Sequence, residues 1–164
     1  MPHLNDIVVV DTGPLIALSG IKLLQIPSQL FDNVWVSEAV VRESLHSFNL
    51  PGALDIASAL KKKWFREKVG FDYPDSPPML GAGEWSAICL ADHAKAYLLV
   101  DDKVARRVAQ SMGVAVLGTC GLLLLAKQRK LIKRVKPLLG LMRGQGYYIS
   151  NELVKQVVTL AGEK

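Results

Sequence analysis

The sequence has few of the residues that build disulfide, zinc or histidine-based sites. It contains two cysteines, Cys89 and Cys120, each inside an apolar segment, and three scattered histidines. Because neither cysteine has a second cysteine or a histidine at metal-ligand spacing, we interpret both as buried thiols. The same scatter argues against a zinc site and against a nucleophile triad built around histidine.

Long apolar runs are scarce as well. The longest, over residues 114–126, is interrupted by two glycines and a threonine. It is shorter than the roughly 20 apolar residues that a membrane-spanning helix requires, so we expect no membrane partner. Residues 1–6 contain no basic stretch leading into an apolar segment, which predicts a cytoplasmic chain without a secretory signal.

The composition is that of a folded domain. Half of the 164 residues are hydrophobic and 21% are charged, which argues against intrinsic disorder. A chain of this length can bury a core without disulfides or a structural metal. We therefore expect one domain over residues 1–164.

Charge is distributed unevenly along the chain. Residues 1–102 carry 8 Lys and Arg against 13 Asp and Glu, whereas residues 103–164 carry 12 against 2. An acidic first part and a basic last part suit a protein that binds metal with one and a polyanion such as nucleic acid with the other. The alternative is a basic helix face that merely keeps the protein in solution.

Short apolar runs alternate with segments of helical pattern. We predict strands at 7–10, 34–36, 64–69, 97–100 and 114–117, and helices at 15–24, 38–47, 53–63, 82–96, 102–112, 120–130, 135–143 and 151–161. Most of these strands lack a polar face, which is typical of a parallel sheet covered on both sides. The predicted fold class is therefore α/β, a three-layer α/β/α sandwich with a central, mainly parallel sheet.

Helical spacing also predicts which residues face the core. Leu54 and Leu60 repeat along the helix 53–63, and Val104 and Val108 repeat along the helix 102–112. We expect all of these side chains to point inward.

Oxygen-bearing side chains follow the predicted strands directly. Asp11 follows the first strand, Asp101 and Asp102 follow the strand 97–100, and Thr119 comes just after the strand 114–117. The carboxyl ends of parallel strands meet at one edge of a sheet, where ligands bind near the point at which strand order reverses. Glu43 and Glu84 lie in helices that begin near that edge, so we expect these acids to share one hollow.

Carboxylates packed together repel one another unless a cation compensates their charge. Oxygen ligands of this kind favour Mg2+ or Mn2+, which proteins hold through a few carboxylates, waters and substrate phosphate. Such a site performs phosphoryl chemistry, in which one ion activates a water and a second can stabilise the leaving oxygen.

Each acid taken alone has a simpler structural interpretation. Asp102 is a plausible helix N-cap and Asp101 a turn residue. Glu84 suits the positive end of a helix dipole, Asp11 an Asx-turn, and Glu43 a helix surface. Their shared location is what favours a functional site.

Three stretches resemble a known family: VVVDTGPLIAL near the start, GEWSAICLA in the middle, and LLVDDKVARRVA followed by GVAVLGTCGLLLLAK. Over nearly its whole length the chain resembles PIN-domain proteins of the small prokaryotic branch. The resemblance implies a PIN-like α/β/α sandwich and a Mg2+- or Mn2+-dependent endoribonuclease. It further implies the toxin of a toxin-antitoxin pair, with an antitoxin partner, and a homodimer.

The resemblance also implies site residues. The four catalytic acids of the family correspond to Asp11, Glu43, Glu84 and Asp102, with Asp101 as a further metal ligand. Glu84 departs from the commonest pattern, which has aspartate there, and lengthens the ligand by one methylene. Thr12 and Thr119 correspond to supporting hydroxyl residues.

Basic residues are candidates for holding the RNA backbone by charge. They are Arg106 and Arg107, together with Lys127, Arg129 and Lys130 in the basic run 127–136. The alternative role of these side chains is solubility.

Three other functions compete with the nuclease. Residues 11–13 match the Asp-Thr-Gly triplet of aspartic proteases, whose fold is all β, whereas helices dominate here. A phosphoacceptor receiver domain has an acidic pair after its first strand, where Asp11 stands alone. The strongest rival is a PIN-like module that binds RNA or a protein partner without cleaving.

Overall fold

The computed structural model describes residues 6–46, 49–71 and 73–164, and within them five strands form one parallel sheet. The strands are β1 (Ile7–Val10), β2 (Asn33–Ser37), β3 (Arg66–Lys68), β4 (Tyr97–Leu99) and β5 (Val116–Leu117). They lie in the order β3-β2-β1-β4-β5, and every pairing is parallel. The predicted parallel sheet is confirmed.

The strand order reverses between β1 and β4. The chain adds β2 and β3 on one side of β1, and then crosses back to add β4 and β5 on the other side. Val10 pairs with Leu99, and the ladder runs one residue further because Asp11 N donates to Leu99 O at 3.0 Å. In an open parallel sheet this reversal is the position where ligands bind.

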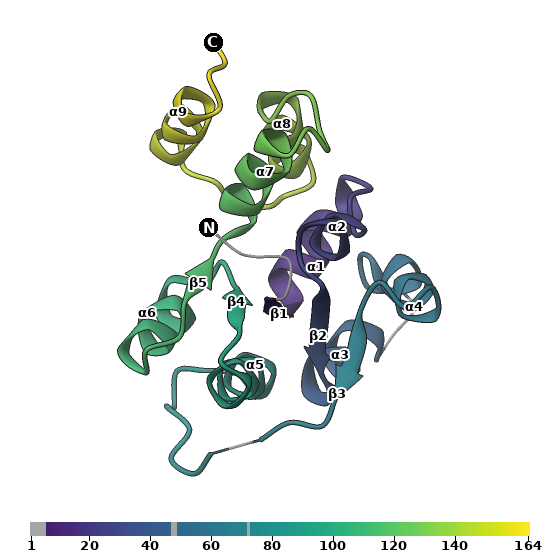
Figure 1. Ribbon diagram of the computed structural model, residues 1–164, viewed down its shortest axis with the longest axis vertical. Helices are drawn as coiled ribbons and strands as arrows, with labels where there is room; N and C mark the ends of the chain where they lie inside the picture. Colours follow the sequence, from purple (N-terminus) through teal and green to yellow (C-terminus); the bar gives the residue numbers. More distant parts are fainter. Residues whose placement is uncertain (1–5, 47–48, 72) are drawn as a thin grey trace.

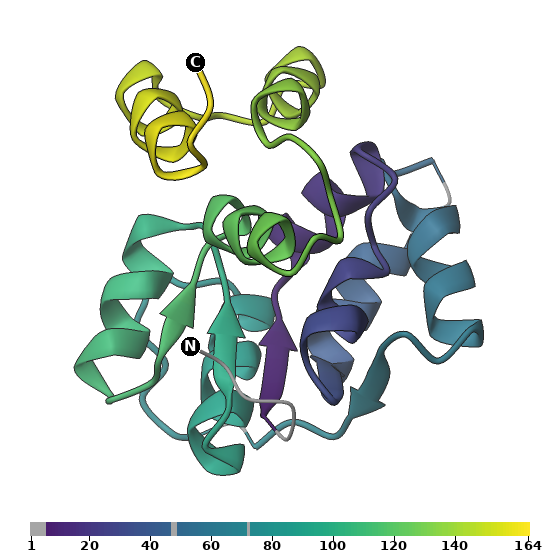
Figure 2. The ribbon, with the colours of Figure 1, turned by 45° about the horizontal axis from the view of Figure 1, so that its top comes forward.

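Helices cover both faces of the sheet. They are α1 (Thr12–Gly20), α2 (Ile26–Leu30), α3 (Glu38–Leu45), α4 (Ala53–Lys61), α5 (Ala82–Ala94), α6 (Lys103–Ser111), α7 (Thr119–Gln128), α8 (Lys136–Gly144) and α9 (Asn151–Leu160). Figures 1 and 2 show α3 and α5 on one face of the sheet and α2 and α7 on the other. The α/β/α sandwich is confirmed.

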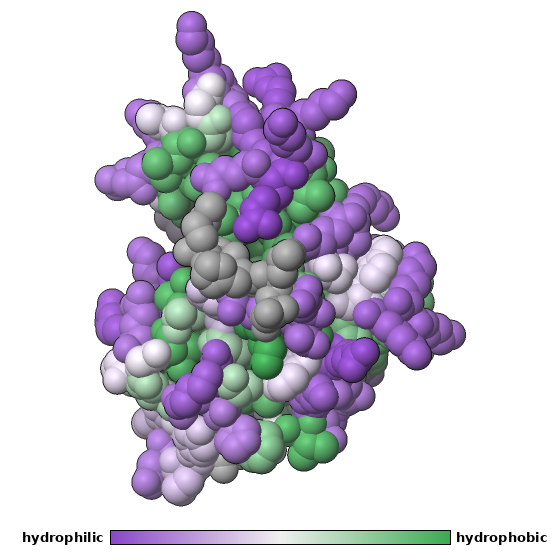
Figure 3. All heavy atoms as spheres, in the orientation of Figure 1, coloured by the Kyte–Doolittle hydropathy of each residue, from purple (hydrophilic) through white to green (hydrophobic). Residues whose placement is uncertain are grey.

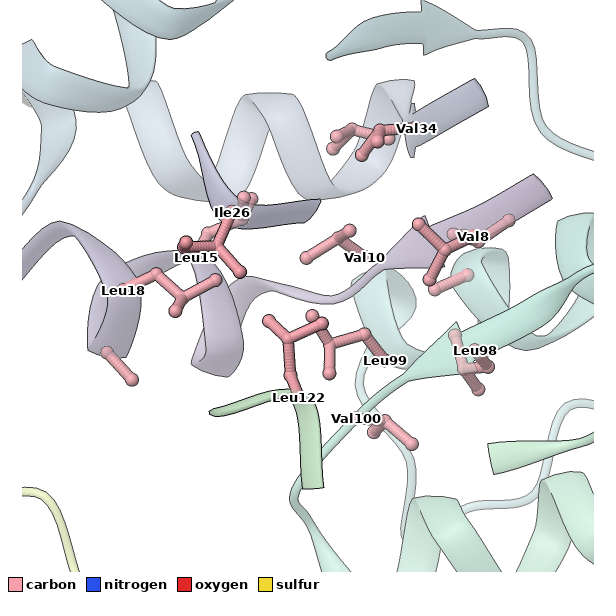
Figure 4. Close-up of a cluster of buried hydrophobic side chains, with 14 of the residues drawn as sticks. Val8, Val10, Leu15, Leu18, Ile26, Val34, Leu98, Leu99, Val100 and Leu122 are labelled. Atoms are coloured by element: carbon pink, nitrogen blue, oxygen red, sulfur yellow. The ribbon is translucent and has the colours of Figure 1, made fainter. Parts of the chain in front are cut away.

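The core is densest around the two central strands. Val8, Val10, Leu98 and Leu99 have no exposed surface, and Leu122 of α7 packs beside them (Figure 4). Burying each of these aliphatic side chains stabilises the fold by about 1.5–3 kcal/mol. The apolar centre therefore fixes β1 and β4 relative to each other, and with them the residues that follow each strand.

The first predicted helix differs from the observed one. It was expected over 15–24, but α1 begins at Thr12 and ends at Gly20. Lys22 has a left-handed backbone with φ 61°, which a continuing helix does not tolerate. The short helix α2, which has Pro27 in its first turn, follows and was not predicted.

The predicted inner faces of two helices were partly wrong. Leu54 is 66% exposed because α4 buries the face that carries Ile56. Val104 is 36% exposed, whereas Ala105 and Ala109 of α6 are fully buried. Alanine lets a helix approach its neighbour closely, so the small residues rather than the valine face inward.

Over 6–46, 49–71 and 73–164, no helix has both the length and the apolar character needed to cross a membrane. Residues 1–5, part of the segment in which we expected no secretory signal, lie outside the described residues, as does Ser47 at the predicted end of the helix 38–47.

The last two helices form an additional layer. Figure 2 shows α8 and α9 stacked above α7, beyond the sandwich itself. Glu163 ties this layer down, since its carboxylate accepts hydrogen bonds from Lys127 Nζ at 2.9 Å, Val135 N at 2.6 Å and Lys136 N at 3.0 Å. Burial opposes ionisation of Glu163, but these three donors outweigh it and hold its pKa at about 2.

We predict that Glu163→Gln lowers the free energy of unfolding by about 2 kcal/mol, because the variant has no charged acceptor for these hydrogen bonds. Since the folded protein depresses the pKa of this acid from 4.5 to about 2, the stabilisation is present above that window and disappears as the pH falls through it. Urea unfolding of both proteins at neutral pH and at the lower end of the window measures the difference. A loss of stability that is equal at both pH values would contradict the role of the charge.

Candidate functional site

Asp11 is a buried acid at the centre of the strand reversal. It follows β1 and is 5% exposed, and its backbone N–H completes the ladder to β4. Its Oδ1 atom is buried and accepts no hydrogen bond from any residue that the structure describes. A buried carboxylate oxygen without a donor is costly unless the group is protonated or a cation compensates it.

The electrostatic environment of Asp11 also disfavours its ionised form. The pKa of Asp11 is raised to about 7, and burial is the largest cause. The negative charges of Glu84, Glu43 and Asp101 also raise it, whereas the backbone N–H of Thr12 lowers it. The fold therefore gathers these acids closely enough for their charges to interact.

Glu43 joins two parts of the site. Its Oε2 accepts a hydrogen bond from Thr12 Oγ1 at 3.0 Å, and its Oε1 accepts one from Gly83 N at 2.9 Å. A Cβ atom at position 83 would come within 2.3 Å of this carboxylate, so only glycine admits the contact. Glu43 thus connects the start of α1 to the start of α5.

Glu84 and Asp102 form the next pair. Glu84 accepts a hydrogen bond from Gly81 N at 3.2 Å, and its carboxyl lies close enough to that of Asp102 for their charges to interact. Burial, followed by the charges of Asp102 and Glu43, raises the pKa of Glu84, against the lowering effect of Gly81 N–H. Asp102 accepts from Ala105 N at 2.9 Å, which confirms its role as the N-cap of α6.

Asp101 has a different environment from Asp11. Its Oδ1 accepts from Thr119 N at 2.8 Å, and its Oδ2 accepts from Thr119 Oγ1 at 2.6 Å. The hydroxyl of Tyr147, in the turn after α8, donates to the same Oδ2. Burial and then the charge of Asp101 raise the pKa of Tyr147.

Tyr147 was missed by sequence reasoning. It lies 46 residues from Asp101 along the chain, after a glycine-containing turn and beside a second tyrosine. Neither feature marks a residue that reaches the edge of a distant sheet, so no sequence signal separates Tyr147 from an ordinary loop aromatic.

The acids do not form a ready ligand cage. Within the described ranges, no group of three or more His, Cys, Asp or Glu side chains is arranged to hold a metal ion as it stands. Glu43, Glu84 and Asp102 instead accept hydrogen bonds from backbone N–H groups. The unpartnered Asp11 Oδ1 among like charges nevertheless fits a divalent cation, because oxygen ligands and uncompensated negative charge are what such an ion requires.

The basic residues predicted to bind RNA differ in whether they already have partners within the protein. Arg106 Nη1 donates to Val100 O at 3.2 Å, and Lys127 Nζ pairs with Glu163, so both have partners within the chain. Arg107, Arg129 and Lys130 are exposed.

Comparison with known proteins links these features to a family. A family model described as PIN domain matches residues 7–163. No curated protein sequence matches the chain. Among solved structures, a PilT N-terminus domain protein from the archaeon Sulfolobus solfataricus P2 is 18% identical, with a TM-score of 0.46 over 71% of this chain and 90% of that one.

We predict that Asp11→Asn stabilises the metal-free protein at neutral pH and above. The folded protein holds the Asp11 proton more tightly than the unfolded chain, so the wild-type free energy of unfolding falls as the pH rises from 3.8 to about 7. The fall amounts to about 1.4 kcal/mol per pH unit. The variant lacks this pH-dependent fall.

Thermal unfolding in EDTA, below and above this window, measures the effect. The difference between variant and wild type should widen with pH. Asp32→Asn, which changes an exposed acid before β2, is the matched control and should show no such widening. If the difference in stability between Asp11→Asn and the wild type did not depend on pH, the claim that burial raises the pKa of Asp11 would be refuted.

Proposed function

This chain belongs to the PIN-domain family, and we propose that it is a metal-dependent ribonuclease that hydrolyses RNA phosphodiester bonds. PIN domains are generally nucleases. The observation that carries the proposal is Asp11, whose buried Oδ1 lacks a donor among the described residues while other acids surround it at the strand reversal. A capping or turn role would not require that arrangement.

The proposed ligands of Mg2+ or Mn2+ are Asp11, Glu43, Glu84 and Asp102, directly or through water. When bound, the ion supplies Lewis acidity to the phosphate and lowers the pKa of a water for attack on phosphorus. Slightly below neutral pH, Asp11 holds a proton in the metal-free protein and would give it up on binding a cation.

Neighbouring groups position these ligands. Thr12 and Gly83 N–H hold the two oxygens of Glu43, and Gly81 N–H holds one oxygen of Glu84. The carboxyl of Glu84 interacts with the charge of Asp102 while it keeps its hydrogen bond from Gly81 N–H. Glutamate at this position is therefore compatible with a shared site.

RNA is proposed to lie along the basic part of the chain. Arg107, Arg129 and Lys130 are exposed, and in Figure 3 hydrophilic side chains occupy much of the upper lobe, which contains α8 and α9. Exposed cations bind phosphates by charge, without sequence preference.

We further propose that the protein is the toxin of a toxin-antitoxin pair. Its antitoxin would be encoded nearby and would cover the acidic edge.

We predict that purified protein cleaves an RNA containing both paired and unpaired regions when Mg2+ or Mn2+ is present. EDTA should abolish cleavage. Asp11→Asn and Glu84→Gln should each lower the rate at least about 100-fold, since a metal ligand supplies several kcal/mol to the transition state. Asp32→Asn should cleave like the wild type.

Cleavage that survives Asp11→Asn would indicate a contaminating nuclease. RNA that is bound but not cleaved by the wild type would replace the nuclease with the alternative, a PIN module that binds RNA or a protein partner.

We predict that the double variant Arg129→Ala, Lys130→Ala weakens RNA binding, because it removes two cations that pair with phosphates. For single-stranded RNA, the slope of log affinity against log salt should become shallower by about 0.7 for each phosphate that the variant no longer neutralises. Fluorescence anisotropy in the Asp11→Asn background measures binding without cleavage. Lys61→Ala, at the exposed end of α4, is the control. An unchanged slope in the double variant would show that Arg129 and Lys130 do not contact the RNA.

A further inference from the structure

We propose that Tyr147 is a positioning residue for the site. Its hydroxyl, delivered by the turn after α8, holds the Asp101 carboxylate and through it the β4–α6 turn that carries Asp102. The inference rests on the proposed nuclease function and assigns to the C-terminal layer a part in the site.

The first step is that Asp101 serves as an anchor. Both of its carboxylate oxygens are engaged by protein donors, Thr119 at two atoms and Tyr147 at one. Thr119 is fully buried, and its side chain is also within hydrogen-bonding reach of the Tyr147 hydroxyl. Hydrogen bonds to a carboxylate are among the stronger ones in proteins, so this cluster holds Asp101 in one orientation.

The second step is that the turn carrying Tyr147 is itself fixed. Gln145 Nε2 donates to Gly20 O at 2.7 Å, which ties the turn to the end of α1. Tyr147 N donates to Met142 O at 3.0 Å, which ties it back to α8. A Cβ atom on Gly13 would lie 3.9 Å from the Tyr147 hydroxyl, so the ring reaches over the first residues of α1, beside Asp11.

The third step connects Asp101 to a proposed ligand. Arg106 Nη1 holds Val100 O, and Val100 N donates to Leu117 O at 2.9 Å, so the residue before Asp101 is fixed. The residue after it, Asp102, caps α6 and lies close enough to Glu84 for their charges to interact. With Asp101 held between them, the direction in which Asp102 leaves β4 is determined.

The C-terminal layer is consequently joined to the catalytic edge. Figure 2 shows α8 and α9 above α7 as a separate layer, yet the turn between them supplies a donor to an acid at the strand reversal. Small displacements of a catalytic group are costly for rate, so a donor that fixes such an edge contributes to activity without touching substrate.

The test compares Tyr147→Phe with Tyr148→Phe. Both remove one hydroxyl, but Tyr148 is 85% exposed and serves as the matched control. We expect Tyr147→Phe to weaken calorimetric Mn2+ binding and to lower kcat, each by about 10- to 100-fold, as for other groups that orient the residues of a metal site. KM for RNA and the far-UV circular dichroism should be unchanged, and Tyr148→Phe should behave like the wild type.

A double-mutant cycle separates positioning from a general structural effect. If Tyr147 acts through Asp101, adding Tyr147→Phe to Asp101→Asn should have little further effect on Mn2+ affinity. Additive effects of the two substitutions, or a Tyr147→Phe protein with wild-type Mn2+ affinity and kcat, would overturn the inference alone. A wild-type protein that neither binds Mn2+ nor cleaves RNA would overturn the proposed function and this inference with it.

Discussion

The burial of one carboxyl group, that of Asp11, is the constraint on which the rest of the site depends. The apolar packing of β1 against β4 carries Asp11 into the protein at the strand reversal, and no described residue donates to its Oδ1. Packing that stabilises the fold therefore produces an electrostatic cost at this position. A divalent cation is the partner that we propose offsets this cost while leaving the acid ionised.

The other acids divide into two kinds around Asp11. Glu43, Glu84 and Asp102 accept hydrogen bonds from the chain, and Glu43 and Asp102 are exposed whereas Glu84 is half-buried. Asp101 is saturated by donors from Thr119 and Tyr147. Identical side-chain chemistry is thus proposed to serve as ligand in one place and as anchor in another, depending on which donors the fold supplies.

Much of this arrangement was predictable, because strand ends are local features of a sequence. Asp11 and Asp101 directly follow apolar runs, and parallel pairing brings the ends of such runs to one edge. Tyr147 was not predictable, since its contact with Asp101 depends on how α8 docks, which no local pattern records. The predicted inward face of α6 was partly wrong for a related reason, because the small Ala105 rather than the more apolar Val104 packs against the core.

The central claim, that a cation compensates the buried Asp11 carboxylate, is tested most directly by calorimetric titration of Mn2+ in buffers of different ionisation enthalpy. Slightly below neutral pH, where Asp11 holds its proton in the metal-free protein, binding should release up to about one proton per ion. Asp11→Asn should show neither that release nor comparable affinity. Binding by the wild type without proton release, or equal binding by the variant, would contradict the account.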